Sequence, residues 1–158
     1  MAEFSVSHVG LCVADLKEAL RFYTEGLGLK VAETYSAGEE VAAAAEINCG
    51  ARLTSQMIVK DGLRRELLWW AEPGCAGAPS AARNQRGLTY LSLTVDDLSA
   101  AEARLVALGA KIIESTRTSV RNDDVAYDLA FLTDPDGTRI ELLKWNNSSS
   151  ETATSHMT

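Results

Sequence analysis

The order of apolar and polar positions along the chain predicts a first set of elements near the N-terminus. Residues 4–13 are apolar-rich and partly alternating, which indicates a strand. Asp15 then marks a helix start, because its carboxylate can accept orphan backbone N–H groups. After Asp15, an apolar stripe at roughly helical spacing is formed by Leu16, Ala19, Tyr23 and Leu27. A second strand follows at residues 30–35.

The same order returns in the second half of the chain. Residues 90–95 match residues 8–13 at an offset of 82, and Asp97 matches Asp15 at that same offset. The second helix carries an apolar stripe of Leu98, Ala101, Leu105 and Leu108. Because repeated segments use equivalent faces of their elements, we expect two similar modules, each with the order β-α-β-β-β.

A turn followed by a strand is the clearest part of the repeat. Residues 61–68 and 136–143 lie 75 residues apart and are identical at six of eight positions. Each copy opens with Asp-Gly, which is typical of a tight turn. Glu66 and Glu141 occupy the same place in the two copies and alternate with apolar residues, so each carboxylate is expected on a largely apolar face. A carboxylate there needs a metal, another cation or a proton; the alternative is an ordinary strand glutamate that faces solvent.

The remaining segments set the predicted domain limits. We expect one domain over residues 1–145, with module one at about 4–72, a Pro- and Gly-containing linker at 73–86 and module two at about 87–145. The Ser- and Thr-rich residues 146–158 are expected to be a disordered tail. Within an insert at 36–51, the alanine-rich part favours a short helix, which could be a lid over a cleft or a plain surface helix.

Composition and charge narrow the class of partner. The chain has 158 residues, is 46% hydrophobic and carries a net charge of −7, which suits a globular domain and disfavours nucleic acid or an anionic membrane as partner. The N-terminal residues support neither a secretory signal nor a membrane span. Three cysteines without CxxC spacing suit reduced thiols in the cytoplasm, namely Cys12, Cys49 and Cys75.

Several other side chains are candidates for a binding pocket. Trp70 shares strand parity with Glu66, so it is the tryptophan that we expect beside that carboxylate, although core or dimer packing is the alternative. Arg52 and Gln56 share one face of a strand and could hold a polar substrate group or face solvent. His8 could be an ordinary histidine with a satisfied hydrogen bond or a functional group of the pocket.

These landmarks together resemble the vicinal oxygen chelate superfamily, which includes glyoxalase I, bleomycin-resistance proteins, methylmalonyl-CoA epimerase and extradiol dioxygenases. The resemblance covers residues 4 to 145 and implies an α+β fold in which two tandem β-α-β-β-β modules form an open, incomplete barrel around a cleft. It is carried by the segments 7–16, Phe22-Tyr23 with Leu27-Gly28-Leu29, 95–98 and 134–142.

The resemblance also implies a metal site with ligands from the first and last strand of each module. The corresponding positions hold His8, Glu66 and Glu141, and Tyr90 stands where the resemblance leads us to expect histidine. The implied ion is divalent: Mn, Fe, Co, Ni or Zn. A phenol binds such an ion only after losing a proton with an ordinary pKa of about 10, so Tyr90 weakens the site or serves as a proton donor beside a metal-free pocket.

Three functions follow as expectations. The first is a glyoxalase-like enzyme, an isomerase, epimerase or lyase that works through an enediolate-type intermediate, with Glu66, Glu141 and Tyr90 as catalytic groups. The second is a metal-free binding or sequestering protein of bleomycin-resistance type. The third and weaker one is an extradiol-type dioxygenase, which should keep both histidines. For each, we expect a small-molecule partner and a homodimer.

Overall fold

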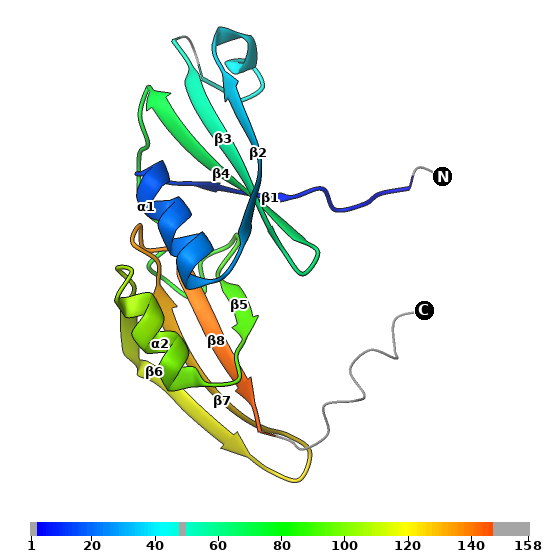
Figure 1. Ribbon diagram of the computed structural model, residues 1–158, viewed down its shortest axis with the longest axis vertical. Helices are drawn as coiled ribbons and strands as arrows, with labels where there is room; N and C mark the ends of the chain where they lie inside the picture. The colour runs from blue at the N-terminus through cyan, green and yellow to red at the C-terminus, as the bar shows by residue number, and fades with distance from the viewer. Residues whose placement is uncertain (1–2, 48–49, 147–158) are drawn as a thin grey trace. The chain divides into compact units, whose positions relative to one another are not determined.

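The computed structural model describes residues 3–47 and 50–146 and divides the chain into two compact units, Met1–Ala78 and Pro79–Thr158 (Figure 1). Each unit is one open four-stranded sheet with a helix packed on it. The predicted α+β class and the tandem β-α-β-β-β order are both confirmed. The boundary between the units falls inside the predicted linker.

The first unit has the strand order β1-β4-β3-β2, with β1 parallel to β4 and the other pairs antiparallel. This order places β4, the strand with Glu66, between two neighbours. Its elements are β1 (Val9–Cys12), α1 (Leu16–Arg21), the π-helical turn η1 (Phe22–Gly26), β2 (Lys30–Ala37), the 3-10 turn η2 (Glu39–Val41), β3 (Arg52–Lys60) and β4 (Leu63–Glu72).

The second unit repeats this topology in the order β5-β8-β7-β6, with β5 parallel to β8. Glu141 on β8 therefore has the same place in its sheet as Glu66 on β4. The elements are β5 (Leu91–Thr94), α2 (Leu98–Val106), β6 (Lys111–Arg121), β7 (Ala126–Thr133) and β8 (Arg139–Trp145).

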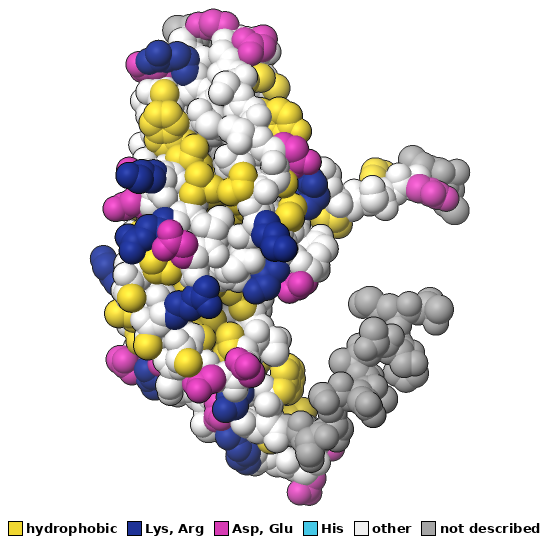
Figure 2. All heavy atoms as spheres, in the orientation of Figure 1, with side chains coloured by type: hydrophobic (Ala, Val, Ile, Leu, Met, Phe, Trp, Pro, Cys, Tyr) yellow, Lys and Arg dark blue, Asp and Glu magenta, His cyan; other side chains and the backbone are white. Residues whose placement is uncertain are grey.

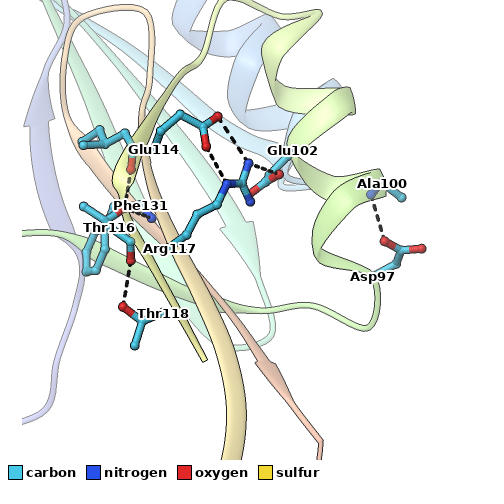
Figure 3. Close-up of polar contacts among 9 residues, drawn as sticks. Asp97, Ala100, Glu102, Glu114, Thr116, Arg117, Thr118 and Phe131 are labelled. Carbon is cyan, nitrogen blue, oxygen red and sulfur yellow. Dashed lines mark hydrogen bonds and ion pairs between the residues drawn. The ribbon is translucent and has the colours of Figure 1, made fainter. Parts of the chain in front are cut away.

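Both helices begin where the sequence predicts. Asp15 accepts the backbone N–H of Glu18 at 2.9 Å, and both it and Asp97 have extended backbone. Asp97 accepts the backbone N–H of Ala100, also at 2.9 Å (Figure 3). These carboxylates satisfy N–H groups that have no partner inside the helix. Among the described residues, no helix is long and apolar enough to cross a membrane.

The core of each unit lies between the helix and one face of the sheet. Because strand side chains alternate, Leu67 on β4 and Ile140 on β8 are fully buried, while Glu66 and Glu141 point to the opposite face. The other large side chains that are fully buried include Phe22, Tyr23 and Ile58 in the first unit and Leu105, Leu132 and Leu142 in the second.

Two predicted elements are shorter than expected. The strand predicted over residues 4–13 is limited to Val9–Cys12, because β1 pairs with β4 only over Arg65–Leu68. Figures 1 and 2 show the preceding segment extending away from the sheet, and Phe4 in it is 96% exposed. The alanine-rich insert forms only the 3-10 turn η2 and a further turn that ends at Glu46, which has a positive φ of 59°. Cys49 and residues 147–158 of the predicted tail lie outside the described residues.

The turn before β8 is held by a buried aspartate. Asp134 Oδ1 accepts the backbone N–H groups of Asp136 and Thr138 at 3.0 and 2.7 Å. Gly137 has a φ of +97°, a conformation that glycine adopts without strain. This Asx turn fixes where β8 starts and thereby fixes the position of Glu141 along the sheet.

An irregularity in β6 is bridged by a side chain. The pairing between β6 and β7 shifts register between Ile113 and Thr118. The hydroxyl of Thr116 accepts the Phe131 N–H at 2.9 Å and donates to the Ile113 carbonyl at 2.6 Å, so it replaces missing backbone bonds (Figure 3). The next residue, Arg117, reaches Glu102 on α2 with two hydrogen bonds of 2.7 and 2.9 Å. The irregular part of β6 is therefore fixed to both β7 and α2.

Candidate functional site

Glu66 lies at the centre of one sheet face in the first unit. Gly10 on β1 and Met57 on β3 are its direct cross-strand neighbours. Directly opposite residues share a face, so the small Gly10 leaves space beside the carboxylate. A Cβ atom added at Gly10 would lie 3.9 Å from Glu66 Oε2.

His8 and Glu66 are brought together, as the sequence predicts for two residues of one site. His8 Nε2 lies 3.2 Å from Glu66 Oε2, and the two side chains are 35% and 19% exposed. On the other side of the imidazole, Nδ1 is 3.0 Å from the hydroxyl of Ser7. The 3.2 Å contact fits Nε2–H as the donor to Glu66 Oε2, with Nδ1 accepting the Ser7 hydroxyl. For Nε2 to bind an ion the ring proton must be on Nδ1, where the Ser7 oxygen can accept it.

The other carboxylate oxygen of Glu66 is held by a buried hydroxyl. Ser55 on β3 donates to Glu66 Oε1 at 2.5 Å. Both oxygens of Glu66 therefore have a defined neighbour, Ser55 on one side and His8 on the other. Sequence reasoning missed Ser55, because its closeness to Glu66 depends on the register of β3 against β4.

Glu141 is bonded by a serine in the second unit too, but from a different strand. Ser92 on β5 lies directly opposite Glu141 and donates to its Oε2 at 2.5 Å. Within residues 3–47 and 50–146, Glu141 Oε1 accepts no hydrogen bond. Ser92 was also missed, although its alternation with Tyr90 along the strand was a usable signal.

Tyr90 is placed near Glu141 through an aromatic neighbour. Its side chain is half exposed, and its ring meets the ring of Phe131 edge to face with 5.1 Å between centroids. Phe131 on β7 is the direct cross-strand partner of Glu141. The phenol, the phenyl ring and the carboxylate therefore belong to one face of the second sheet. Sequence reasoning did not identify Phe131 as a neighbour of these two candidate residues.

The tryptophans follow the strand parity that the sequence predicts. Trp70 lies opposite Leu53, on the β4 face that carries Glu66. Trp145 has the equivalent place on β8, and its ring meets that of Tyr127 with 5.5 Å between centroids. Each unit thus places a glutamate and a tryptophan four residues apart on one sheet face.

Gln56 and Arg52 are not brought together with these residues. Gln56 pairs with Leu67 across the sheet, is 5% exposed and lies on the face opposite to Glu66. Its amide nitrogen donates to the Glu33 carbonyl at 2.9 Å, and its oxygen accepts the Thr34 hydroxyl at 2.7 Å. Arg52 is exposed and forms an ion pair of 3.0 Å with Glu72. A register shift after Arg52 interrupts the shared strand face on which both residues were predicted.

The donor atoms of the first unit fit two neighbouring positions around a divalent ion. Two ligands at about 2.1 Å and at right angles are about 3 Å apart. His8 Nε2 and Glu66 Oε2 are separated by 3.2 Å, and Ser7 stands behind the imidazole as a ligating histidine requires. The described residues include no group of three or more His, Cys, Asp or Glu side chains that could hold an ion.

A comparison with protein-family profiles identifies the family. Residues 5–142 match the profile of the Glyoxalase/Bleomycin resistance protein/Dioxygenase superfamily. A search of curated protein sequences finds no match.

Three solved structures show the shared fold. A glyoxalase family protein from Bacillus cereus is 22% identical over 92% of this chain and 98% of its own, with a TM-score of 0.75. A fosfomycin resistance protein from Listeria monocytogenes, solved with Mn(II) and sulfate, is 15% identical over 90% and 93%, with a TM-score of 0.56. A glyoxalase I mutant from Zea mays is 20% identical over 87% and 44%, with a TM-score of 0.57. The chain belongs to the Glyoxalase/Bleomycin resistance protein/Dioxygenase superfamily.

Proposed function

We propose that the protein is a glyoxalase-like small-molecule enzyme, a metal-assisted isomerase, epimerase or lyase. One observation carries the proposal: His8 Nε2 and Glu66 Oε2 face each other at 3.2 Å, and the outer side of each group is held by a serine. An imidazole and a carboxylate held in this way suit Mn, Fe, Co, Ni or Zn. Relatives support it, since the Listeria monocytogenes protein was solved with Mn(II).

In this proposal His8, Glu66 and Glu141 hold the ion. A divalent ion bound there would polarise substrate oxygens and lower the pKa of a neighbouring C–H group. Glu66, fixed at both oxygens, serves as a permanent ligand. Glu141, bonded by Ser92 at one oxygen only, is the carboxylate that can accept the proton.

Metal titration of the full-length chain tests this proposal. Calorimetry with Mn²⁺ should show one ion per chain, and His8→Ala, Glu66→Gln and Glu141→Gln should each weaken binding by more than about tenfold. Glu72→Gln is the matched control, because Glu72 lies on β4 as Glu66 does but pairs with the exposed Arg52. If none of Mn, Fe, Co, Ni and Zn binds, or if the three site variants bind as the control does, the proposal is wrong.

The contact between Tyr90 and Phe131 favours a second candidate, a metal-free protein that binds or sequesters a small molecule. The edge of one ring packs against the face of the other. In this arrangement Tyr90 would contact a bound small molecule as an aromatic side chain and would not serve as a metal ligand. Tyr90→His distinguishes the two functions. In the metal enzyme, this substitution should tighten Mn²⁺ binding by about tenfold or more, since it adds an imidazole ligand. In the sequestering protein, Tyr90→His should leave metal binding absent.

We also propose that the protein is a homodimer in the cytoplasm. Val31 and Tyr35 on β2, an edge strand of the first sheet, are each more than half exposed, and such edges are commonly covered by a second chain. The three cysteines have no CxxC spacing, which suits reduced thiols in a reducing compartment.

A further inference from the structure

We infer that Arg83 and Arg139 form a binding site for the phosphate group of a small molecule, beside the sheet face that carries Glu141. The inference deepens the proposed function and rests on it in one respect, namely that the molecule bearing the phosphate group is the substrate. All residues of this site belong to the second unit.

Arg139 lies at the start of β8, where the linker contacts the second sheet. It has the same strand parity as Glu141, so both side chains belong to one face. Its guanidinium donates to the carbonyl of Ala81 at 3.2 Å. The preceding turn contacts the linker too, since a Cβ atom added at Gly137 would lie 3.8 Å from the Pro79 ring. The linker backbone therefore fixes the Arg139 guanidinium at one end of the Glu141 face.

Arg83 supplies a second guanidinium at the same place. It donates to the carbonyls of Ser80 and Thr89 at 2.8 and 3.4 Å. Ser80 directly precedes Ala81, so the carbonyls of two successive residues hold the two guanidinium groups. Burial lowers the pKa of Arg139, and the positive charge of Arg83 lowers it further. The two cations are therefore close enough to repel each other.

Neither arginine has a carboxylate partner within residues 3–47 and 50–146. In the same residues, Nε of both arginines and Nη1 of Arg139 have no hydrogen-bond acceptor. A guanidinium carries five N–H donors in a planar fork that matches the oxygens of phosphate and carboxylate groups. Two such groups together suit a doubly charged phosphate better than a single carboxylate.

The first unit shows how the equivalent arginine is neutralised. Arg64, 75 residues before Arg139, forms an ion pair of 3.0 Å with Glu33. The residue 81 positions after Glu33, at the equivalent place in the second repeat, is Glu114. Arg117 donates to Glu114 at 2.6 Å (Figure 3). The carboxylate that would correspond to Glu33 is thus bonded to another arginine, and an external anion can neutralise Arg139 in its place.

The surroundings of Arg139 also fit an organic group attached to the phosphate. Phe131 lies opposite Glu141 on the same face, and the Tyr90 ring packs against Phe131. An organic group would extend from Arg139 along this face toward the two aromatic rings. The net charge of −7 gives the chain no general attraction for anions, so binding of a phosphate requires a defined site.

Titration of the full-length chain in buffer without divalent ions tests the inference, with inorganic phosphate and phenyl phosphate as probes. The NMR signals of the Arg83 and Arg139 Nε–H groups should shift to saturation. Arg83→Gln and Arg139→Gln should each weaken phenyl phosphate binding by about tenfold or more. Phenyl phosphate should bind more tightly than inorganic phosphate by about tenfold, because its ring contacts the aromatic side chains.

Arg64→Gln is the matched control and should bind phenyl phosphate as the wild type does, because Arg64 has the equivalent strand position but is paired with Glu33. If Arg139→Gln lowers the free energy of unfolding, Arg83→Gln, at an exposed residue, decides the question. Shifts that do not saturate, shifts of equal size at Arg64, or equal affinity for the two probes would overturn the inference.

The metal titration separates this inference from the proposed function. Binding of one Mn²⁺ per chain together with no binding of either phosphate probe overturns only the phosphate site. Saturable phosphate binding by a chain that binds none of Mn, Fe, Co, Ni and Zn overturns the proposed function and supports the phosphate site.

Discussion

At the scale of single residues, the two sheets differ most at the positions beside the glutamates. Gly10 lies directly opposite Glu66, and Ser92 lies directly opposite Glu141. Of these two neighbours, only Ser92 carries a hydroxyl. A hydroxyl at Gly10 would approach Glu66 Oε2, the oxygen that faces His8. The absence of a side chain at Gly10 therefore keeps this oxygen available.

Gly10→Ser should reduce Mn²⁺ affinity by about tenfold or more, because a new hydroxyl would compete for Glu66 Oε2. Gly10→Ala is the control. It adds a Cβ that meets Leu68 at 3.4 Å, a contact that small shifts can absorb, but it adds no donor. Calorimetric titration of both variants measures the difference. Equal affinities for the serine and alanine variants would contradict the prediction.

Arg65 is an unusual residue of the first core. It occupies the place that Ile140 has in the second repeat and is only 7% exposed. Its guanidinium lies over the Tyr23 ring at 5.4 Å and donates to the Tyr23 hydroxyl at 3.4 Å. Within the part of the chain that the structure describes, Arg65 Nε has no hydrogen-bond partner. A buried donor without an acceptor lowers stability.

Arg65→Met should therefore leave the free energy of unfolding unchanged or raise it by about 1 kcal/mol, because the methionine keeps most of the apolar stem and removes the unsatisfied donor. Arg64→Met, on the exposed side of the same strand, is the control. Urea unfolding followed by circular dichroism provides the measurement. A loss greater than about 1 kcal/mol would show that the contact with Tyr23 outweighs the buried Nε.

At the scale of elements, the β6–β7 hairpin carries a pH-sensitive cluster. Asp128 on β7 accepts hydrogen bonds from Ser119, Arg121 and Asn146. Together they lower the pKa of this carboxyl from 3.8 to about 2, with the Ser119 hydroxyl as the largest cause. Since the pKa is lower in the folded chain, Asp128 stabilises the fold above about pH 4, and this contribution is lost as the pH falls toward 2.

Asp128→Asn should be less stable than the wild type at pH 7, and the gap should shrink as the pH falls from 4 to 2. Urea midpoints measured at several pH values in this window would show the convergence. Asp123→Asn, in the turn of the same hairpin, is the control: its difference in urea midpoint from the wild type should not shrink between pH 4 and pH 2. A gap between wild type and Asp128→Asn that stays constant down to pH 2 would exclude the proposed stabilisation.

The elements themselves could largely be predicted from the sequence, while their register could not. The repeated Asp-Gly turns and the alternation around Glu66 and Glu141 predicted β4 and β8, and Asp15 and Asp97 predicted both helix starts. Alanine propensity predicted a helix in the insert. In its described part, residues 36–47 and 50–51, the insert has the 3-10 turn η2 and a further turn that ends at Glu46, since short helices need packing that a surface insert does not supply.

Candidate site residues also differ in whether the sequence could predict them, depending on whether their position requires the strand register. The resemblance to the superfamily implied that His8 and Glu66 belong to one site, and the two side chains meet because β1, which follows His8, is a neighbour of β4. Ser55 could not, since a hydroxyl meets Glu66 only in one register of β3, and a slip by one residue would turn it to the other face. Gln56 was predicted as a pocket residue from the alternation of side chains along β3 alone. That alternation does not show which face of β4 lies on the same side of the sheet, and Gln56 pairs with Leu67.

At the scale of the whole molecule, the proposed homodimer makes a direct prediction. Light scattering after size exclusion should give twice the chain mass of 17.0 kDa. Tyr35→Glu on the edge strand β2 should shift the population toward monomer, because it places a charge on an exposed apolar edge. Val106→Glu on α2 is the control. A wild-type monomer at micromolar concentration would contradict the proposal.

The hydroxyl of Thr116 has a consequence for local opening of the sheet. Because a side chain, and not a backbone carbonyl, accepts the Phe131 amide, exchange of that amide with solvent depends on one oxygen. Thr116→Val should speed deuterium exchange at Phe131 by about tenfold or more and leave Leu132 unaffected. Exchange mass spectrometry or NMR would detect the change. Phe131 lies opposite Glu141 and against Tyr90. Local separation of β6 from β7 at this amide would therefore also disturb the surroundings of the Glu141 carboxylate.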